Sequence, residues 1–275
     1  NRAQRTDGLC HQKRRREGLK GEGRMEKDAL IRPGERLDSL QFGDLCILQK
    51  LDAFRFGTDS VLLADFPTVR RGDYIADLGT GSGIITILMA SRHPDSRFAA
   101  LEIQPEMADM AARSMALNGL TDRVEVRSCD FREAARLYGY GKFSLAVCNP
   151  PYGKAGGALL SQTDAQRIAR HESDCTVDDL AAAAFDLLRT GGRLAVVFPA
   201  ARAFELMYAM RTHRLEPKRI RTVHATASRA PKLVLIEAVK GGGSMLHWME
   251  PLVLSDDSGQ PTAEWKRIYR VPENP

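Results

Sequence analysis

The sequence predicts an α/β protein built on a doubly wound, mostly parallel seven-stranded sheet that ends in an antiparallel edge hairpin. From about residue 74, short apolar runs alternate with amphipathic segments of helix length, which is typical of βαβ units. The glycine-rich stretch DLGTGSG at 77–83 follows the first run and allows a sharp turn into a helix. Only six residues, TASRAP, separate the last two runs; since a parallel crossover needs more, that pair must be antiparallel.

Seven apolar runs of strand length define the predicted sheet, and they lie at 74–80, 97–103, 124–130, 143–149, 193–199, 218–225 and 232–240. Segments with an apolar stripe at helical spacing predict helices between them, at 82–93, 105–119, 176–192 and 201–213. The start and stop signals agree with these limits. Pro105 opens the second helix, Thr176 and Asp179 resemble a capping box, and Gly191 and Gly192 end the third helix.

Shorter elements flank this core. The stretch ERLDSLQFGDLCILQ predicts two strands around a turn near Gly43, and TDSVLLADF predicts a short helix with Thr58 or Asp59 as its N-cap. The stretch GGGS at 241–244 predicts a flexible break before a segment that carries both tryptophans. We expect four parts: a basic tail at 1–24, a hairpin and helix at 25–72 packed on the core, the main domain at 73–240 and a C-terminal extension at 241–275.

The net charge of +5 is concentrated at the N-terminus. Residues 1–24 hold eight Lys/Arg and three Asp/Glu, so the remaining 32 basic and 32 acidic residues balance. We expect that tail to be disordered, solvated charge, with Met25 as a candidate start of the native chain. The tail is therefore weak support for a nucleic-acid partner.

Cysteine usage and hydropathy predict a cytoplasmic protein. The five cysteines are scattered without a CxxC pair, which predicts reduced thiols and neither a disulfide framework nor a zinc site. No apolar run reaches the roughly 18 residues of a membrane span, and the N-terminus lacks the apolar stretch of a secretory signal. His171 and Glu172 alone do not make a metal site. We therefore expect no membrane, no metal and a monomer.

The glycine turn is the first candidate site. Gly79, Gly81 and Gly83 give the spacing GxGxG, which departs from the dinucleotide pattern GxGxxG at its third glycine. Asp77 suits a cofactor with an ammonium group, such as S-adenosylmethionine, and Glu102, near the end of the second strand, can accept from a ribose diol. A dinucleotide and a turn without ligand remain alternatives. The candidate cofactor residues are Asp77, Gly79, Thr80, Gly81, Gly83, Glu102 and Ile103.

The end of the third strand adds a second feature, the stretch CDF at 129–131. Asp130 could accept a hydrogen bond from an adenine amino group, and Phe131 could pack on the adenine ring. The alternative is a strand end followed by a helix cap, which needs no ligand.

Asn149-Pro150-Pro151-Tyr152 follows the fourth strand and is the candidate catalytic site. If the first and fourth strands are neighbours, this tetrapeptide faces the glycine turn across the sheet edge. The Asn149 oxygen and the Pro150 carbonyl can accept both N–H bonds of a nucleobase amino group, and these bonds strengthen as the nitrogen becomes positive. Tyr152 offers a face for base stacking, and the two prolines stiffen the backbone. The alternative is a rigid strand exit.

Together these motifs resemble class I S-adenosylmethionine-dependent amino-methyltransferases. The blocks ERLDSLQ, FRFGTDSVLLA, NPPYGKAGG, ARHESDCTVDDL and PKLVLIEAVKGG resemble the bacterial tRNA1(Val) adenine-37 N6-methyltransferase family from about residue 30 to 270. The resemblance implies methyl transfer to N6 of an anticodon-loop adenine, with S-adenosylmethionine as cofactor and tRNA as partner. It also implies that Phe56, Gly57, Thr58 and Asp59 lie near the methionine end of the cofactor.

Residues 214–232 predict an RNA contact, because they hold six Lys/Arg against one acid, Glu216. The candidate RNA-binding residues are Lys218, Arg219, Arg221, Arg229 and Lys232. The loop after Tyr152 is long, contains glycine and carries Arg167 and Arg170, so it is suited to closing over a substrate. The alternative is a hairpin whose charges are merely solvated.

Other functions remain compatible with the sequence. The same tetrapeptide could hold a glutamine amide of a protein, a DNA adenine or an rRNA guanine. Two alternatives belong to different functional classes. A non-catalytic RNA-binding module would show no turnover, and a dinucleotide-dependent oxidoreductase would prefer NAD to S-adenosylhomocysteine.

Overall fold

A nine-stranded, mostly parallel sheet forms the centre of the computed structural model, which describes residues 29–51, 57–150 and 175–271. The strand order is β10-β8-β9-β7-β6-β3-β4-β5, with β11 pairing beside β8. The parallel strands are β3 (Tyr74–Leu78), β4 (Arg97–Glu102), β5 (Val124–Ser128), β6 (Phe143–Cys148) and β7 (Leu188–Pro199). The order reverses between β3 and β6, so the predicted doubly wound sheet is confirmed.

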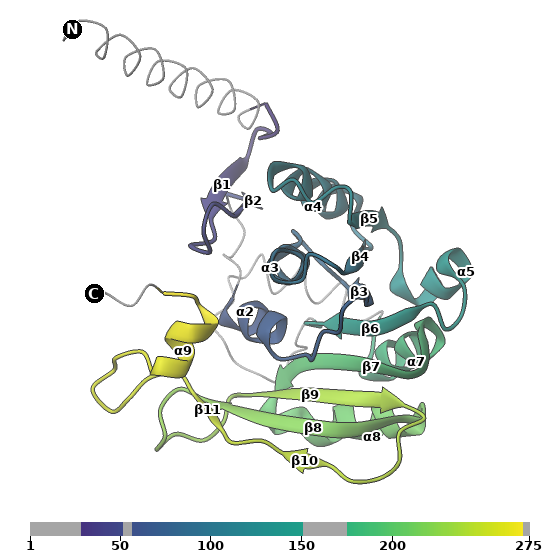
Figure 1. Cartoon of the computed structure of the whole chain (residues 1–275), viewed down its shortest axis with the longest axis vertical. Coiled ribbons are helices and arrows are strands. Elements are labelled where there is room, and N and C mark those ends of the chain that lie inside the picture. The colour runs from purple at the N-terminus through teal and green to yellow at the C-terminus, as the bar shows by residue number, and fades with distance from the viewer. Residues whose placement is uncertain (1–28, 52–56, 151–174, 272–275) are drawn as a thin grey trace, which may run out of the picture.

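Helices cover both faces of the sheet (Figure 1). One face carries α2 (Thr58–Asp65), α3 (Ile84–Arg92) and α4 (Pro105–Leu117), and the other carries α5 (Ala134–Tyr138), α7 (Val177–Leu187) and α8 (Ala203–Thr212). Because successive strand residues point to opposite faces, Ile75 belongs to one hydrophobic core and Ala76 to the other. Burial on both faces explains why the central strands read as continuous apolar runs.

The last long strands, β8 (Leu215–His224) and β9 (Leu233–Lys240), form the predicted antiparallel hairpin. The strand β9 also pairs antiparallel with β7, and Leu233 lies opposite Pro199. The hairpin loop, 225–232, therefore lies at the carboxyl edge of the parallel strands.

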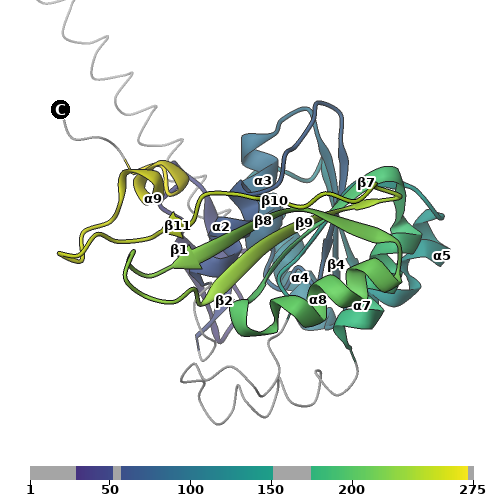
Figure 2. The same ribbon diagram turned by 90° about the horizontal axis from the view of Figure 1, so that it is seen from below.

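The C-terminal segment returns to the sheet. It adds β10 (His247–Trp248) and β11 (Leu252–Val253) in parallel beside β8, so two short strands lie outside the hairpin that the sequence placed at the sheet edge. The helix α9 (Ala263–Ile268) then packs near α2, and Figures 1 and 2 both show this contact. The stretch GGGS thus precedes a segment that completes the fold.

The N-terminal hairpin has the predicted strands, β1 (Glu35–Ser39) and β2 (Cys46–Lys50), with Gly43 in its turn. It docks on α4. The Arg113 guanidinium donates to both Glu35 carboxylate oxygens at 2.6 and 2.7 Å, and the Ser114 hydroxyl accepts from the Leu48 amide at 3.1 Å. A buried hairpin face and a charged clamp hold this element in place.

Two predicted helix limits are wrong. The helix α7 ends at Leu187 rather than at Gly192, because β7 begins at Leu188 and its pairing with β6 shifts register before Arg193. The helix α2 has Gly57 as its N-cap, without a side-chain cap, rather than Thr58 or Asp59. The start of α7 is as predicted, since Thr176 and Asp179 form a reciprocal capping box.

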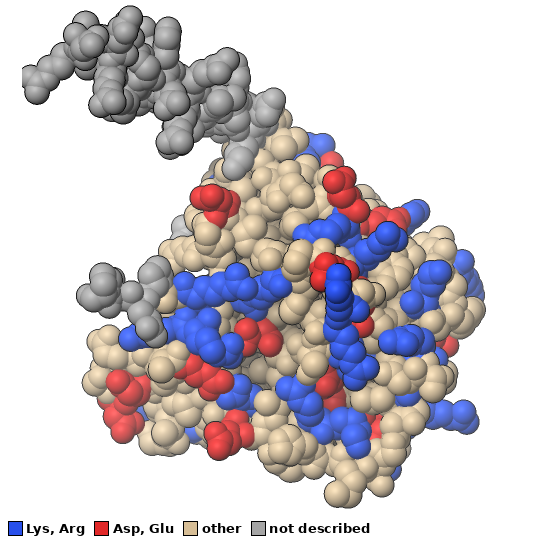
Figure 3. Space-filling view, in the orientation of Figure 1, with Lys and Arg blue, Asp and Glu red and all other residues tan. Residues whose placement is uncertain are grey.

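Positive and negative side chains are intermixed on the face drawn in Figure 3, and the residues after position 24 carry equal numbers of basic and acidic side chains. Within the described ranges, no helix is long and apolar enough to cross a membrane. In those ranges no group of three metal-ligating side chains gathers, and Cys46, Cys129, Cys148 and Cys175 form no disulfide with one another. The predicted tail at 1–24, Met25 and the loop after Tyr152 lie outside the described residues.

Candidate active site

The candidate site lies at the carboxyl edge of the sheet, where β3 meets β4 on one side and β6 on the other. The pairs Ala76–Ala146 and Asp77–Val147 confirm that the first and fourth predicted strands are neighbours. Their ends are also joined directly, because the Cys148 thiol donates to the Leu78 carbonyl at 3.0 Å. Burial raises the pKa of Cys148 well above its usual range, so this residue serves as a neutral structural thiol.

Asp77 has a buried carboxylate with one oxygen that can still accept a hydrogen bond. Its Oδ2 accepts hydrogen bonds from the hydroxyls of Thr80 and Thr86, both at 2.7 Å. Its Oδ1 is buried and has no hydrogen-bond partner among the described residues. Burial raises the pKa of Asp77 to about 6, so at neutral pH the fold holds an ionised carboxylate that is poorly solvated. A cation at Oδ1 would stabilise that carboxylate, and the ammonium group of S-adenosylmethionine is such a cation.

The turn after Asp77 leaves room for a ligand. Gly79 and Gly81 have φ values of +78° and +58°, and a Cβ added at either would meet nothing within 4 Å. Gly83 is different, because a Cβ there would lie 2.5 Å from the Met115 Cε, so a side chain at this position would have to displace the end of Met115. Two glycines therefore leave space above the strand ends, and the third leaves room for Met115.

Glu102 faces this turn. It is 6% exposed, and its two carboxylate oxygens accept from the amides of Gly81 and Gln104, each at 2.9 Å. Each oxygen retains a second lone pair, which suits acceptance from the two hydroxyls of a ribose. The neighbouring Ile103 is 49% exposed and offers an apolar surface beside it.

Asp130 is already engaged. It follows β5 and caps a 3-10 turn, η1 (Phe131–Glu133), by accepting from the Arg132 amide at 2.9 Å, and it also pairs with the Arg132 guanidinium. Burial acts to raise the pKa of Asp130, but the hydrogen bonds from Arg132 outweigh it and the pKa is lowered. The alternative of a strand end with a helix cap thus describes the local geometry, and a bond to an adenine amino group would have to share this carboxylate.

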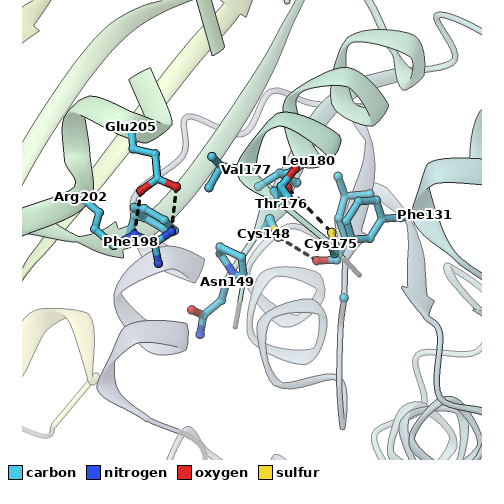
Figure 4. Close-up of a pocket in the computed structure, with 13 residues that line it drawn as sticks. Phe131, Cys148, Asn149, Cys175, Thr176, Val177, Leu180, Phe198, Arg202 and Glu205 are labelled. Carbon is cyan, nitrogen blue, oxygen red and sulfur yellow. Dashed lines mark hydrogen bonds and ion pairs between the residues drawn. The ribbon is translucent and has the colours of Figure 1, made fainter. Parts of the chain in front are cut away.

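A cavity of about 190 Å³ opens beside these strand ends. Figure 4 shows Asn149 between Phe131 on one side and the paired Arg202 and Glu205 on the other. Those residues come from the ends of β5, β6 and β7 and from the start of α8. The remaining lining is mostly apolar, and consists of Leu78, Gly79, Cys148, Pro150, Cys175, Thr176, Val177, Leu180 and Phe198.

The Asn149 side chain is oriented by a residue that the sequence did not single out. Its Nδ2 donates to the hydroxyl of Ser60 at 3.1 Å, and Ser60 is buried on α2. This hydrogen bond defines the donor end of the amide, so the oxygen is the end suited to accept from a substrate. Pro150 lines the same cavity, whereas Pro151 and Tyr152 lie outside the described residues.

The start of α2 lies beside this asparagine. Thr58 and Asp59 form its first turn, after Gly57, while Phe56 lies outside the described residues. The helix α2 also contacts α9, which links it to the C-terminal segment. The helix that the resemblance places near the cofactor is therefore secured by the end of the chain.

The predicted RNA-binding residues divide into two groups. Arg219 pairs with Glu237 and lies over the Phe66 ring at 4.9 Å, and Arg221 pairs with Glu264. Lys218 is similarly occupied, since it donates to the carbonyls of Gly243 and Ser244 at 3.0 and 3.1 Å.

Arg229 and Lys232 differ, because they are exposed at the hairpin loop. That loop shares the carboxyl edge with the cavity, as the pairing of Leu233 with Pro199 requires. The structure thus brings these two cations to the side of the candidate site and ties the other three into the fold.

Sequence reasoning missed Ser60, Phe198, Arg202 and Glu205. Ser60 is a single polar residue in the apolar run SVLLA, and such a residue indicates a buried hydrogen bond. The other three could have been found from the rule that ligands bind at strand ends. Phe198 lies at the end of β7, Arg202 and Glu205 follow it, and β7 is the neighbour of β6.

Comparison with known proteins assigns the family. Residues 51–213 match the family model described as "Methyltransferase small domain". A tRNA1(Val) (adenine(37)-N6)-methyltransferase from Porphyromonas gingivalis is 34% identical over 67% of this chain and 74% of its own. The chain belongs to the tRNA1(Val) (adenine(37)-N6)-methyltransferase family. A relative of the same name from Aeromonas hydrophila is 31% identical over 69% of this chain and 78% of its own.

A solved structure supports the fold of this methyltransferase. The chain resembles a predicted O-methyltransferase from Agrobacterium tumefaciens with a TM-score of 0.65 and 23% identity, over 78% of this chain and 96% of the other. Members of the family use S-adenosylmethionine, which confirms the predicted cofactor and sets aside the dinucleotide alternative. The residues fit it, since Asp77 has an unpartnered buried oxygen and the glycine turn is open.

Proposed function

We propose that this methyltransferase acts on tRNA and transfers a methyl group to N6 of an anticodon-loop adenine, the position named in its relatives. The observation that supports it most is the Asn149 amide, whose donor end is held by Ser60 at a strand end facing the glycine turn. An amide oriented in this way is suited to accept from an amino group. The role of Asn149 is therefore recognition of an exocyclic amine.

The chemistry follows from this orientation. S-adenosylmethionine supplies a methyl group carried on a positively charged sulfur. The Asn149 oxygen and the Pro150 carbonyl would accept the two N–H bonds of the adenine amino group, whose lone pair forms the new N–C bond as the S–C bond breaks. As the nitrogen becomes tetrahedral and positive, both hydrogen bonds strengthen, which favours the transition state. One proton then leaves to water, so no charged base is required.

The cofactor would be held by groups already in position. Asp77 would bind the ammonium group, Glu102 the ribose hydroxyls, and the open turn at Gly79 and Gly81 would admit the cofactor close to the backbone. Phe131 lines the cavity and would pack on the adenine ring. In the same proposal Tyr152 stacks on the target base, which leaves the RNA stack to reach the cavity.

The exposed cations Arg229 and Lys232 support an anionic partner at this edge. Phosphates bound by them would position an RNA loop over the cavity, while Asn149 reads the base. We further propose that the enzyme works in the cytoplasm as a monomer, where its tRNA substrate is available.

Methyl transfer from labelled S-adenosylmethionine to total tRNA, DNA and protein, followed by nucleoside digestion, tests this proposal. We expect N6-methyladenosine in tRNA. Label in DNA, in rRNA guanine or in protein glutamine, without methyladenosine in tRNA, would refute it. Asn149→Ala should abolish turnover while binding of S-adenosylhomocysteine, measured by calorimetry, stays within a few-fold of the parent. Unchanged tRNA binding by a protein with no turnover on any acceptor would instead support a non-catalytic RNA-binding module.

A further inference from the structure

Two aromatic side chains stand exposed on α8. Phe204 is 77% exposed and Tyr208 is 67% exposed, and their rings stack with centroids 6.3 Å apart and an interplanar angle of 29°. The core does not use them, because α8 packs through Leu206, Ala209 and Met210 on its opposite side. Together they form a flat apolar surface, which we call the α8 aromatic pair.

The α8 aromatic pair begins at the rim of the cavity. Phe204 lies in the chain between Arg202 and Glu205, which both line the cavity that contains Asn149. Arg202 and Glu205 are joined by two hydrogen bonds of 2.8 Å, so the side chains on both sides of Phe204 in the sequence are paired with each other at the rim. A nucleotide next to a base in the cavity would thus reach this surface.

Positive charge lies beside the same rim. The Ala200 amide donates to the Lys232 carbonyl at 2.9 Å, which holds the hairpin loop against the turn that leads into α8. Arg229 and Lys232 are exposed on that loop. An exposed aromatic surface next to exposed cations suits a single-stranded nucleic acid, whose bases stack and whose phosphates pair.

We propose that the α8 aromatic pair is a stacking platform for the unpaired nucleotides that flank the target adenine. The inference rests on the proposed function, in which the substrate is an RNA loop. The cavity takes the flipped adenine, Phe204 and Tyr208 stack its neighbours, and the hairpin loop holds the backbone. The platform contributes to RNA affinity rather than to the chemical step.

Steady-state methylation of a tRNA1(Val) transcript by Phe204→Ala and Tyr208→Ala tests the platform. We expect the KM for tRNA to rise roughly 10-fold, with kcat and S-adenosylhomocysteine affinity unchanged, because the loss of base stacking weakens RNA binding alone. The aromatic replacements Phe204→Tyr and Tyr208→Phe should keep the parent KM. Tyr140→Ala is the matched control, since Tyr140 is 70% exposed but precedes β6 and so lies at the opposite edge of the sheet.

Removing the partner base distinguishes stacking from a general surface effect. A transcript with an abasic nucleotide next to adenine 37 should raise the KM of the parent enzyme, and adding Phe204→Ala should raise it little further. Additive losses, or an unchanged KM in both alanine variants, would overturn the platform while leaving the proposed function intact. If the parent enzyme methylates no tRNA at all, the proposed function fails, and the platform fails with it.

Discussion

Replacing Ser60 with alanine removes one hydroxyl from α2. The variant tests the orientation of the Asn149 amide while Asn149 itself is kept. The Ser60 hydroxyl accepts from the Asn149 Nδ2 at 3.1 Å, and Ser60 is only 6% exposed. Alanine fits the same space and keeps the helix. The variant therefore leaves the amide in the site but allows it to rotate.

The size of the effect follows from one hydrogen bond. A net hydrogen bond in a folded protein is worth about 0.5–1.5 kcal/mol. If its loss destabilises the transition state by that amount, kcat falls roughly 2- to 12-fold. Binding of the cofactor should not change, since Asp77, Glu102 and the glycine turn are untouched.

Single-turnover methyl transfer to tRNA, together with calorimetric binding of S-adenosylhomocysteine, measures both quantities. Ser91→Ala is the control, because Ser91 lies on α3 and its hydroxyl donates to the Leu88 carbonyl at 2.9 Å. We expect a slower methyl-transfer rate only in Ser60→Ala. A rate within 2-fold of the parent, or a similar decrease in both variants, would refute the argument that Ser60 orients the asparagine.

Three further predictions concern the framework of the site. The folded pKa of Asp77, about 6, lies above its usual value, so its ionisation disfavours the folded state increasingly as pH rises. Asp77→Asn should therefore raise the free energy of unfolding of the cofactor-free protein, by up to about 3 kcal/mol at pH 8 and less at pH 5, while weakening S-adenosylhomocysteine binding; an equal gain at both pH values would contradict this. In urea unfolding, Gly83→Ala should destabilise by about 1 kcal/mol more than Gly72→Ala, which shares a positive φ but meets open space; equal losses would exclude the clash. Thr262→Ala should lower the free energy of unfolding by about 1 kcal/mol, because the Thr262 hydroxyl caps α9 by accepting from the Trp265 amide at 3.1 Å; an unchanged free energy would exclude this role of the cap.

Most of the fold could be predicted because its signals are local. The capping box at Thr176, the proline at the start of α4 and the short link that makes β8 and β9 antiparallel each act within a few residues, and the structure confirms all three, although the link is two residues longer than predicted. The end of α7 could not be predicted in this way. Gly191 and Gly192 look like a helix stop, but pairing of β7 with β6 takes over at Leu188, and tertiary pairing outweighs a local signal.

The candidate site shows the same division. The sequence alone determined the glycine turn, the acids at the strand ends and the proline-stiffened exit after β6, because each is a short contiguous pattern with its own backbone requirement. Only the tertiary structure decided which side chains meet. It brings Ser60 to Asn149 across 89 positions of sequence, and it ties Arg219 and Arg221 to carboxylates while leaving Arg229 and Lys232 exposed. Partner choice depends on which elements pack together, and no local pattern encodes that.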